Sequence, residues 1–323
     1  MLSYRKLAMR VLGRPLHTEG IDSPRPASQR AAAFALTAAM LITLAAPAFA
    51  KTWHIEDGDI TVKAGDTKGT NKVSQGESTD VPDTDTVITN REKNASSNTV
   101  TIETNDKNDK VEVTLKDVNI DTSSRNKAAV SVTGEGDTNI KLDGDNALKS
   151  DIYRSGIYGS GSGSLTISGG ENDSLTAQGG SGANGISSSG SLTISGGTVT
   201  ANGDDGGRGI SSSGSVTISG GSTVTANGGN GTISGGDGIC SNGGVTISGG
   251  STVTANGGNG GSLVGGDGIR SGGGLTVSDG TVTAKGGNGD SKDGYGGDGI
   301  RSGGVITISG NTVNAAGGSG GKV

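Results

Sequence analysis

Residues 216–231 read VTISGGSTVTANGGNG, and residues 245–260 repeat the same sixteen residues 29 positions later. Three interpretations compete for so glycine-rich a stretch: a disordered tract, a calcium-binding glycine-rich repeat, or one coil of a solenoid. Calcium-binding β-rolls repeat a GGxGxD motif about every nine residues. Here GGNG occurs once per unit of about 29 residues, and only Gly286–Asp290 approaches the full motif, which disfavours a β-roll.

The chain from residue 156 onward consists of units that begin with a Gly-Ile pair. The pairs start at Gly156, Gly185, Gly209, Gly238, Gly268 and Gly299, with spacings of 29, 24, 29, 30 and 31 residues. Each unit continues with two short alternations of apolar and polar residues and ends in a glycine loop of variable length. A disordered tract has no reason to keep apolar residues in register while loop lengths change. The repeat therefore favours a folded solenoid.

The alternations have the period of two that is typical of β-strands. Val216 and Ile218 point to one side of the first strand, as do Val224 and Ala226 in the second. Units stacked at ~4.8 Å bury a continuous apolar column that no unit buries alone. The sequence predicts an all-β fold, a single-stranded parallel β-helix with three short strands per coil. Glycine then serves corners that need a positive φ or a close approach of coils, and the variable loops lie at one corner.

Composition divides the chain into three parts. Residues 1–50 carry six basic residues, an apolar run of 16 residues at 31–46 and a small-x-small ending, which predicts a signal peptide. Residues 51–97 are predicted as an N-terminal cap and first strands, and residues 98–323 as the β-helix, with glycine-rich repeats over 156–323. The apolar run is shorter than the roughly 20 residues that span a bilayer. We therefore expect a secreted protein, extracellular or at the cell surface, with no membrane-spanning segment after signal removal.

Charge argues against a nucleic-acid-binding protein, and cysteine content excludes a fold stabilised by intrachain disulfides. Without residues 1–50 the chain has 20 basic and 30 acidic side chains, a net charge of −10. Such a chain lacks the basic surface that phosphate binding needs, so nucleic acid is not an expected partner. With Cys240 as the single cysteine, no intrachain disulfide can form. Cys240 replaces the serine or arginine of other repeats, which indicates an incidental substitution.

One stretch of the charged half is distinctive. Residues 111–150 read VEVTLKDVNIDTSSRNKAAVSVTGEGDTNIKLDGDNALKS, and they are followed by GSLTISGG and by coils of the GGTVTANG type. This combination resembles the secreted polysaccharide-binding β-helix proteins of clostridial and related gut bacteria, often labelled carbohydrate-binding domain-containing proteins, whose coil is similar to that of pectate lyases. The resemblance covers the chain from about Trp53 onward. It implies a right-handed helix, calcium among the coils and affinity for plant cell-wall polysaccharide without hydrolysis, and it carries over no individual ligand residue.

No catalytic residue is expected. Past residue 50 the chain has one histidine, His54, and no Ser/His/Asp or Cys/His constellation can be placed. Lyase chemistry would need clustered carboxylates around calcium and a basic residue acting as base. The sequence therefore predicts that the protein is not an enzyme. Trp53, one of four aromatic residues past residue 50, has two interpretations: it closes the open end of the helix, or it stacks on a sugar.

One row of carboxylates is a candidate metal site. Three loops end in GGDGI, which places Asp237, Asp267 and Asp298 at equivalent positions of successive coils. Like charges stacked at ~4.8 Å raise each other's pKa unless a positive group lies with them. That group is either calcium, the one cofactor predicted for this chain, or the arginines Arg270 and Arg301. In a third interpretation the aspartates are solvated turn residues.

Outward-facing threonines form a second array. Four units supply the pairs Thr198 and Thr200, Thr223 and Thr225, Thr252 and Thr254, and Thr281 and Thr283. Such ladders resemble those of ice-binding proteins. Threonine also suits an exposed strand position and supports its neighbours across coils, which is the simpler interpretation.

Two functions are consistent with these features. In the first, the protein is a non-catalytic carbohydrate-binding module that holds a cell-wall polysaccharide, with calcium assisting. The few aromatic residues argue against stacking on crystalline glucans and favour acidic or highly hydroxylated polymers. In the second, it is a structural or adhesin-like surface stalk. In either case an uncapped helix end would expose strand edges. Three alternatives stay open: the last loop folds over the end, the protein self-associates end to end, or the gene product is shortened.

Overall fold

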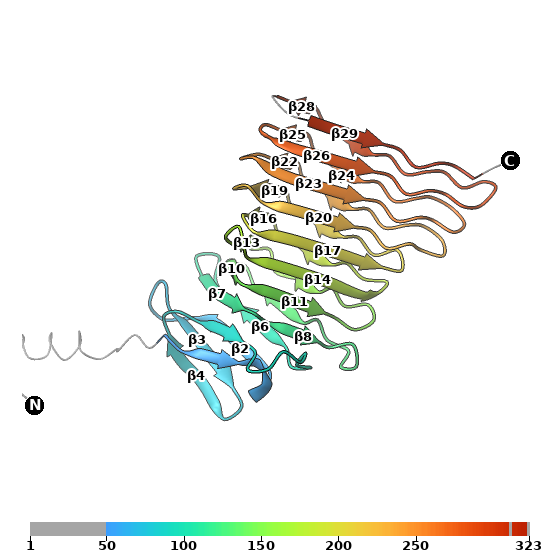
Figure 1. The fold of residues 1–323 in the computed structure, drawn as a ribbon. Helices are drawn as coiled ribbons and strands as arrows, with labels where there is room; N and C mark the ends of the chain where they lie inside the picture. Colours follow the sequence, from blue (N-terminus) through green and yellow to red (C-terminus); the bar gives the residue numbers. More distant parts are fainter. Residues whose placement is uncertain (1–49, 310–311, 322–323) are drawn as a thin grey trace, which may run out of the picture. The chain divides into compact units, whose positions relative to one another are not determined.

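The computed structural model describes residues 50–309 and 312–321, which form a stack of β-coils (Figure 1). The predicted signal peptide, residues 1–50, lies outside the described residues except for Ala50. Within the described ranges every regular element is a β-strand, apart from the 3-10 helix η1 (Ile55–Asp57). The predicted all-β class is confirmed.

The strands form three sheets, and from β7 onward each coil contributes one strand to each sheet. Sheet 1 contains, in spatial order, β1 (Thr52–His54), β5 (Val87–Thr89), β7 (Lys110–Lys116), β10 (Asp137–Asp143), β13 (Leu165–Ser168), β16 (Leu192–Ser195), β19 (Val216–Ser219), β22 (Val245–Ile247), β25 (Leu275–Val277) and β28 (Ile306–Ile308). Sheet 2 contains β8 (Asn119–Asp121), β11 (Asp145–Lys149), β14 (Ser174–Ser181), β17 (Thr198–Asp204), β20 (Thr223–Asn227), β23 (Ser251–Asn256), β26 (Gly280–Lys285) and β29 (Thr312–Ala316). Sheet 3 contains β4 (Ser78–Asp83), β3 (Asn71–Gln75), β2 (Ile60–Ala64), β6 (Val100–Glu103), β9 (Val130–Thr133), β12 (Ile157–Gly159), β15 (Ile186–Ser188), β18 (Ile210–Ser212), β21 (Ile239–Ser241), β24 (Ile269–Ser271) and β27 (Ile300–Ser302). Successive coils pair in parallel, so the predicted parallel β-helix with three strands per coil is confirmed.

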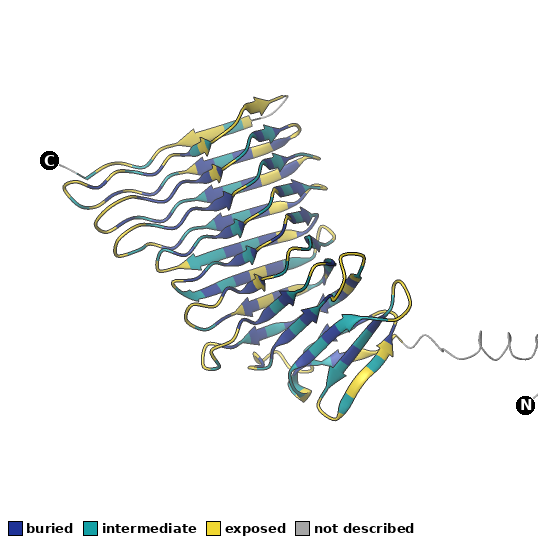
Figure 2. Ribbon diagram, turned by 180° about the vertical axis from the view of Figure 1, so that it is seen from behind, coloured by how far each residue is buried: buried dark blue, intermediate teal, exposed yellow. Residues whose placement is uncertain are grey.

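The two identical segments occupy neighbouring coils. Val216 and Ile218 of β19 pair with Val245 and Ile247 of β22, and all four side chains are at most 1% exposed. The valine and alanine positions of β20 and β23 pair in the same way in sheet 2. Figure 2 shows these buried positions recurring from coil to coil. Because each buried valine or isoleucine contributes roughly 1.5–3 kcal/mol, this apolar column is the main stabilising feature of the fold.

Residues 51–97, predicted as a cap with first strands, contain strands β1 to β5. Strands β1 and β2 pair in parallel with β5 and β6, so parallel coiling begins before residue 98. Strands β3 and β4 then fold back on β2 as antiparallel neighbours and form the edge of sheet 3. Trp53 lies at this end, 2% exposed, with Nε1 donating to Oδ2 of Asp83 at 2.7 Å and Nζ of Lys51 3.8 Å from its ring centre. The ring therefore closes the end of the column, and its burial leaves no face for stacking on a sugar.

The glycines serve two separate purposes, and both were expected. At the turn between the sheet 1 and sheet 2 strands, Gly220 and Gly221 have φ of +68° and +71°, and Gly249 and Gly250 have +63° and +73°. Residues with a side chain rarely adopt this left-handed conformation. Elsewhere the glycines allow neighbouring backbones to approach closely.

The close approach is concentrated in the loops between sheets 2 and 3, here called the glycine arms (228–237, 257–267 and 286–298). Figure 1 shows these arms projecting from the later coils and lengthening toward the C-terminal end. The N–H of Gly236 donates to the carbonyl of Gly229, and the N–H of Gly258 donates to the carbonyl of Gly236, at 2.9 and 2.8 Å. A Cβ on Gly258 would lie 2.0 Å from the Gly229 carbonyl oxygen. The variable loops are thus ordered by a backbone hydrogen-bond ladder that only glycine permits.

Candidate functional site

The predicted metal-site aspartates do lie in one row, where the glycine arms return to sheet 3. Asp237 and Asp267 are buried, at 6% and 5% exposed, whereas Asp298 is exposed. The N–H of Asp267 donates to Oδ1 of Asp237 at 2.9 Å, and the N–H of Asp298 donates to Oδ1 of Asp267 at 2.8 Å. The carboxylates of Asp237 and Asp267 therefore each accept a backbone N–H from the following coil.

The positive group paired with this row is Arg208, which was not predicted, while the charge of the predicted Arg301 favours the ionised form of Asp267. Arg208 occupies the equivalent position one coil before Asp237, and its Nε lies 3.1 Å from Oδ2 of Asp237. The sequence contains a sign of this arginine: residues 206–210 read GGRGI, whereas the next coils read GGDGI. Burial raises the pKa of the Asp267 carboxyl. The hydrogen bond from the Asp298 N–H opposes this shift, and the charges of Asp237 and Asp298 add to it.

The row offers few free oxygens to a calcium ion, which takes six to eight oxygen ligands. Oδ1 of Asp237 and of Asp267 each accept a backbone N–H, and Oδ2 of Asp237 faces Arg208. The described residues contain no group of three or more His, Cys, Asp or Glu side chains that could hold a metal ion. Calcium at Asp237, Asp267 and Asp298 stays a prediction.

Cys240 lies next to this row and matches its predicted place in the repeat. It pairs with Ser211 of the preceding coil and Arg270 of the following one. The side chain is 6% exposed, and burial raises the pKa of its thiol. A buried thiol that is held protonated is a poor nucleophile.

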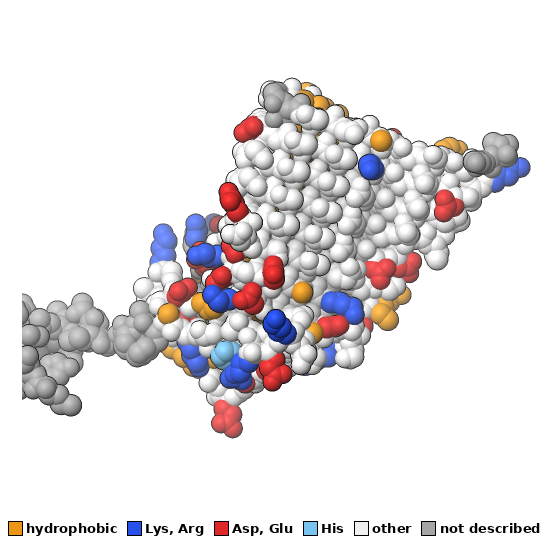
Figure 3. Space-filling view, in the orientation of Figure 1, with side chains coloured by type: hydrophobic (Ala, Val, Ile, Leu, Met, Phe, Trp, Pro, Cys, Tyr) orange, Lys and Arg blue, Asp and Glu red, His pale blue; other side chains and the backbone are white. Residues whose placement is uncertain are grey.

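The threonine ladders are in register on the outer face of sheet 2. Thr223 pairs with Thr252 and Thr252 with Thr281, while Thr225 pairs with Thr254 and Thr254 with Thr283. Figure 3 shows that the surface over these coils carries few charges, whereas charged side chains gather over the first coils. Ice binding by these ladders stays a prediction, and recognition of a particular ligand is better sought among the charged coils.

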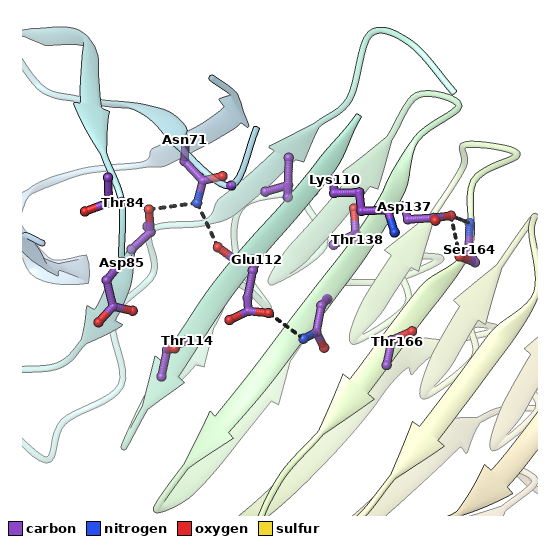
Figure 4. A pocket seen from close by; sticks show the side chains of 14 residues that line it. Asn71, Thr84, Asp85, Lys110, Glu112, Thr114, Asp137, Thr138, Ser164 and Thr166 are labelled. Carbon is purple, nitrogen blue, oxygen red and sulfur yellow. Dashed lines mark hydrogen bonds between the residues drawn. The ribbon is translucent and has the colours of Figure 1, made fainter. Parts of the chain in front are cut away.

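The charged coils contain a groove of about 450 Å³ on the outer face of sheet 1. Its lining comes from the segment between β4 and β5 and from strands β3, β7, β10 and β13 (Figure 4). The lining residues are Gly69, Asn71, Thr84, Asp85, Thr86, Lys110, Val111, Glu112, Thr114, Asp137, Thr138, Asn139, Ser164 and Thr166. Most of these side chains carry hydroxyl, amide or charged groups, so the groove offers many hydrogen-bonding partners.

One wall of the groove is attached by Asn71. This residue is 5% exposed, and its Nδ2 donates to Oγ1 of Thr86 at 2.9 Å and to the backbone carbonyl of Glu112 at 2.7 Å. The antiparallel strand β3 and the segment before β5 are thereby fixed to β7. The floor beyond them is a plain parallel sheet, so the folded-back N-terminal strands create the concave shape.

The floor presents a row of polar side chains from successive coils. Glu112, Asn139 and Thr166 pair in sequence across β7, β10 and β13. Nδ2 of Asn139 donates to Oε2 of Glu112 at 2.9 Å, and Oγ of Ser168 donates to Oδ1 of Asn139 at 3.1 Å. Nearby, the hydroxyl of Ser164 donates to Oδ1 of Asp137. These bonds hold the floor side chains in fixed positions.

No groove residue was named from the sequence, although the charged half was expected to matter. The useful signal lies in the row itself. The positions equivalent to Glu112 and Asn139 carry threonine in six later strands of sheet 1, from β13 to β28. The long contact between residue 71 and residue 112, which closes the groove, leaves no pattern in the sequence.

Comparisons with known proteins add no assignment: no family model, no curated protein and no solved structure matches the chain. In the described residues, no helix has the length and apolar character that a membrane crossing requires.

Proposed function

We propose that this protein is a secreted, non-catalytic carbohydrate-binding β-helix protein that holds a polysaccharide chain in the groove of sheet 1. The observation that carries the proposal is the groove itself, a concave site lined by hydroxyl, amide and carboxylate groups. Concave sites with convergent polar groups are the usual form of ligand sites. Sugar hydroxyls both donate and accept, which matches such a lining. Secretion rests on the signal-peptide pattern of residues 1–50.

The fixed floor supports the proposal further. Because Glu112 and Asn139 are already hydrogen-bonded to each other, their orientation costs little entropy when a ligand binds. Oε1 of Glu112 has no hydrogen-bond partner among the described residues and is free to accept a sugar hydroxyl. The strands of sheet 1 beyond β13 continue the floor, with threonine at the equivalent positions.

The test is affinity electrophoresis through gels that contain soluble cellulose derivatives, xylan or galactomannan. The variant Glu112→Ala with Asn139→Ala should bind at least roughly tenfold more weakly, since it removes a charged and a neutral hydrogen-bonding group. The matched control is Thr217→Ala with Thr246→Ala, in the same outward row of sheet 1 but outside the groove. Equal retardation of the two variants would reject the groove as the site. Release of unsaturated sugars would instead indicate a lyase.

A structural or adhesin-like stalk is the second candidate, and the last coil favours it. Ile306 and Ile308 of β28 are 47% and 48% exposed, whereas Leu275 and Val277, their equivalents in β25, are buried. We propose that this apolar face supports end-to-end self-association. Sedimentation over a range of concentrations should show association that Ile306→Lys abolishes. A wild-type protein that is monomeric throughout would reject the association.

A further inference from the structure

The charges around the groove carry an inference about the class of polysaccharide, which rests on the proposed function. We infer that the groove takes an uncharged polysaccharide and rejects polyuronates. Its lining contains three carboxylates, those of Asp85, Glu112 and Asp137, and a single cation, Lys110. Acidic polymers, which the sequence left open as ligands, are therefore the disfavoured class.

The carboxylates are placed to meet a ligand. Asp85 and Glu112 are exposed and Asp137 is half-buried, and Figure 4 shows them along the length of the groove. None of the three forms an ion pair among the described residues. Glu112 and Asp137 are held by the neutral partners Asn139 and Ser164, which leave their negative charge in place. A uronate chain lying here would place like charges close together in a partly desolvated site, which is strongly unfavourable.

Cations on the same strands do not cancel this field. Lys116 lies beyond the lining and pairs with Asp143 at 2.8 Å. Lys141, on the neighbouring strand β10, pairs with the lining residue Thr114 but is itself outside the lining, so Lys110 remains the one cation of the lining. The groove therefore keeps an excess of negative charge where the ligand would contact it.

The hydrogen-bonding capacity points to the same ligand class. Oε1 of Glu112, Oδ2 of Asp137 and both carboxylate oxygens of Asp85 have no hydrogen-bond partner among the described residues. A neutral sugar supplies hydroxyl donors to these acceptors, whereas a uronate adds acceptors and a charge. Charge-assisted hydrogen bonds of this kind are about twice as strong as neutral ones.

The test compares one polymer backbone in two charge states. Retardation is measured in gels of polygalacturonate, of the same polymer fully methyl-esterified, and of a neutral xylan or galactomannan, at low and high salt. We expect the neutral polymers to bind at least about tenfold more tightly than polygalacturonate at low salt, with a smaller difference at high salt. The variant Asp85→Asn with Glu112→Gln keeps the shapes of the side chains and should reduce the difference. Thermal melting confirms that it is folded.

The outcomes separate the two proposals. Polygalacturonate bound as tightly as its methyl ester would overturn the charge selection and leave carbohydrate binding intact. An unchanged preference in the charge-neutralised variant would also overturn it. Binding of no polymer would overturn the proposed function together with the inference.

Discussion

The backbone N–H of Asp267 donates to Oδ1 of Asp237 at 2.9 Å, across two successive coils. The same relationship recurs from Asp298 to Asp267 and, through an amide oxygen, from Arg208 to Asn184. An oxygen at this position of the repeat therefore satisfies a backbone donor at the corner where the coil turns into sheet 3. Asn184, Asp237 and Asp267 supply this acceptor and Arg208 does not, so where the acceptor is present a neutral amide oxygen serves as well as a carboxylate.

Substitution of Asp267 tests this account. Burial raises the pKa of the Asp267 carboxyl above its unfolded value. The folded state then holds a proton more tightly than the unfolded state, so stability falls as the pH rises through this pKa. Asp267→Asn keeps Oδ1 and removes the charge, so it should melt at a higher temperature than wild type at pH 7 and equally at pH 3.

The matched control for that experiment is Asp267→Ala, which removes the acceptor. It should be less stable than Asp267→Asn by about 1 kcal/mol at both pH values, because both variants lack the charge and only the alanine variant leaves the Asp298 N–H without its partner. A lower melting temperature for Asp267→Asn than for wild type at pH 7 would contradict the account and favour a required charge, as a bound cation would need.

Thr138 provides a prediction about the core. It lies in the apolar column between Val111 and Leu165 and is 1% exposed, and its Oγ1 has no hydrogen-bond partner. A buried hydroxyl without a partner costs free energy that a methyl group of the same size does not. Thr138→Val should therefore raise the free energy of unfolding by about 1 kcal/mol, measured by urea denaturation.

Thr122 is the control for Thr138. It is equally buried, at 0% exposed, but its Oγ1 donates to the carbonyl of Lys127 at 2.7 Å. Thr122→Val should lower the free energy of unfolding by about 1 kcal/mol. If both valine variants change stability in the same direction, hydrogen bonding of the hydroxyl is not what distinguishes the two sites.

The glycine arms make a steric prediction. Gly258→Ala would place a Cβ 2.0 Å from the carbonyl oxygen of Gly229, so the ladder must open or shift. We expect the free energy of unfolding of this variant to fall by at least about 2 kcal/mol. Amide hydrogen exchange at Gly236 and at residue 258 should become faster. Gly317→Ala, whose nearest neighbour atom would lie 3.5 Å away, should be close to neutral. Comparable exchange in both variants would show that the ladder does not order the arms.

The sequence was sufficient for the fold because the determinants of the coil are local and repeated. The alternation at Val216 and Ile218 fixes which side chains point inward, and the Gly-Ile spacing fixes where each coil restarts. The same regularity placed the aspartates in one row and the threonines in register. Periodicity carries information about neighbouring coils, and those predictions required nothing else.

The groove could not be predicted in this way. Its wall depends on the contact of Asn71 with Thr86 and with the carbonyl of Glu112, which joins strands 41 residues apart outside the repeat. No spacing rule connects these residues, because β3 and β4 fold back against the direction of the coils. The ion pair of Arg208 with Asp237 was not predicted for another reason: Arg208 is an exception to the aspartate that the next three coils carry at this position.

Asp59, in the first coil, has a pKa shift opposite in direction to that of Asp267 and therefore predicts the opposite dependence of stability on pH. Burial alone would raise the pKa of Asp59. Hydrogen bonds from Lys127, the N–H of Thr99 and Arg125 outweigh this effect, so the pKa lies below its ordinary value. Lys127 and Arg125 approach its two oxygens at 2.7 and 2.9 Å. The stability from this cluster is present above the unfolded pKa and is lost as the pH falls through the folded pKa.

Asp59→Asn should therefore destabilise the protein at pH 7 by roughly 1 kcal/mol, as expected for a partly exposed ion pair. The difference from wild type should shrink as the pH falls below the ordinary carboxyl pKa and disappear once the wild-type carboxyl is protonated in the folded state as well. Thermal melting of both proteins from pH 2 to pH 7 measures this convergence. Because the cluster joins the first coil to the segment after β8, hydrogen exchange should rise first in β2 and β6. A constant difference at every pH would show that Asp59 acts through its shape and hydrogen bonds and not through its charge.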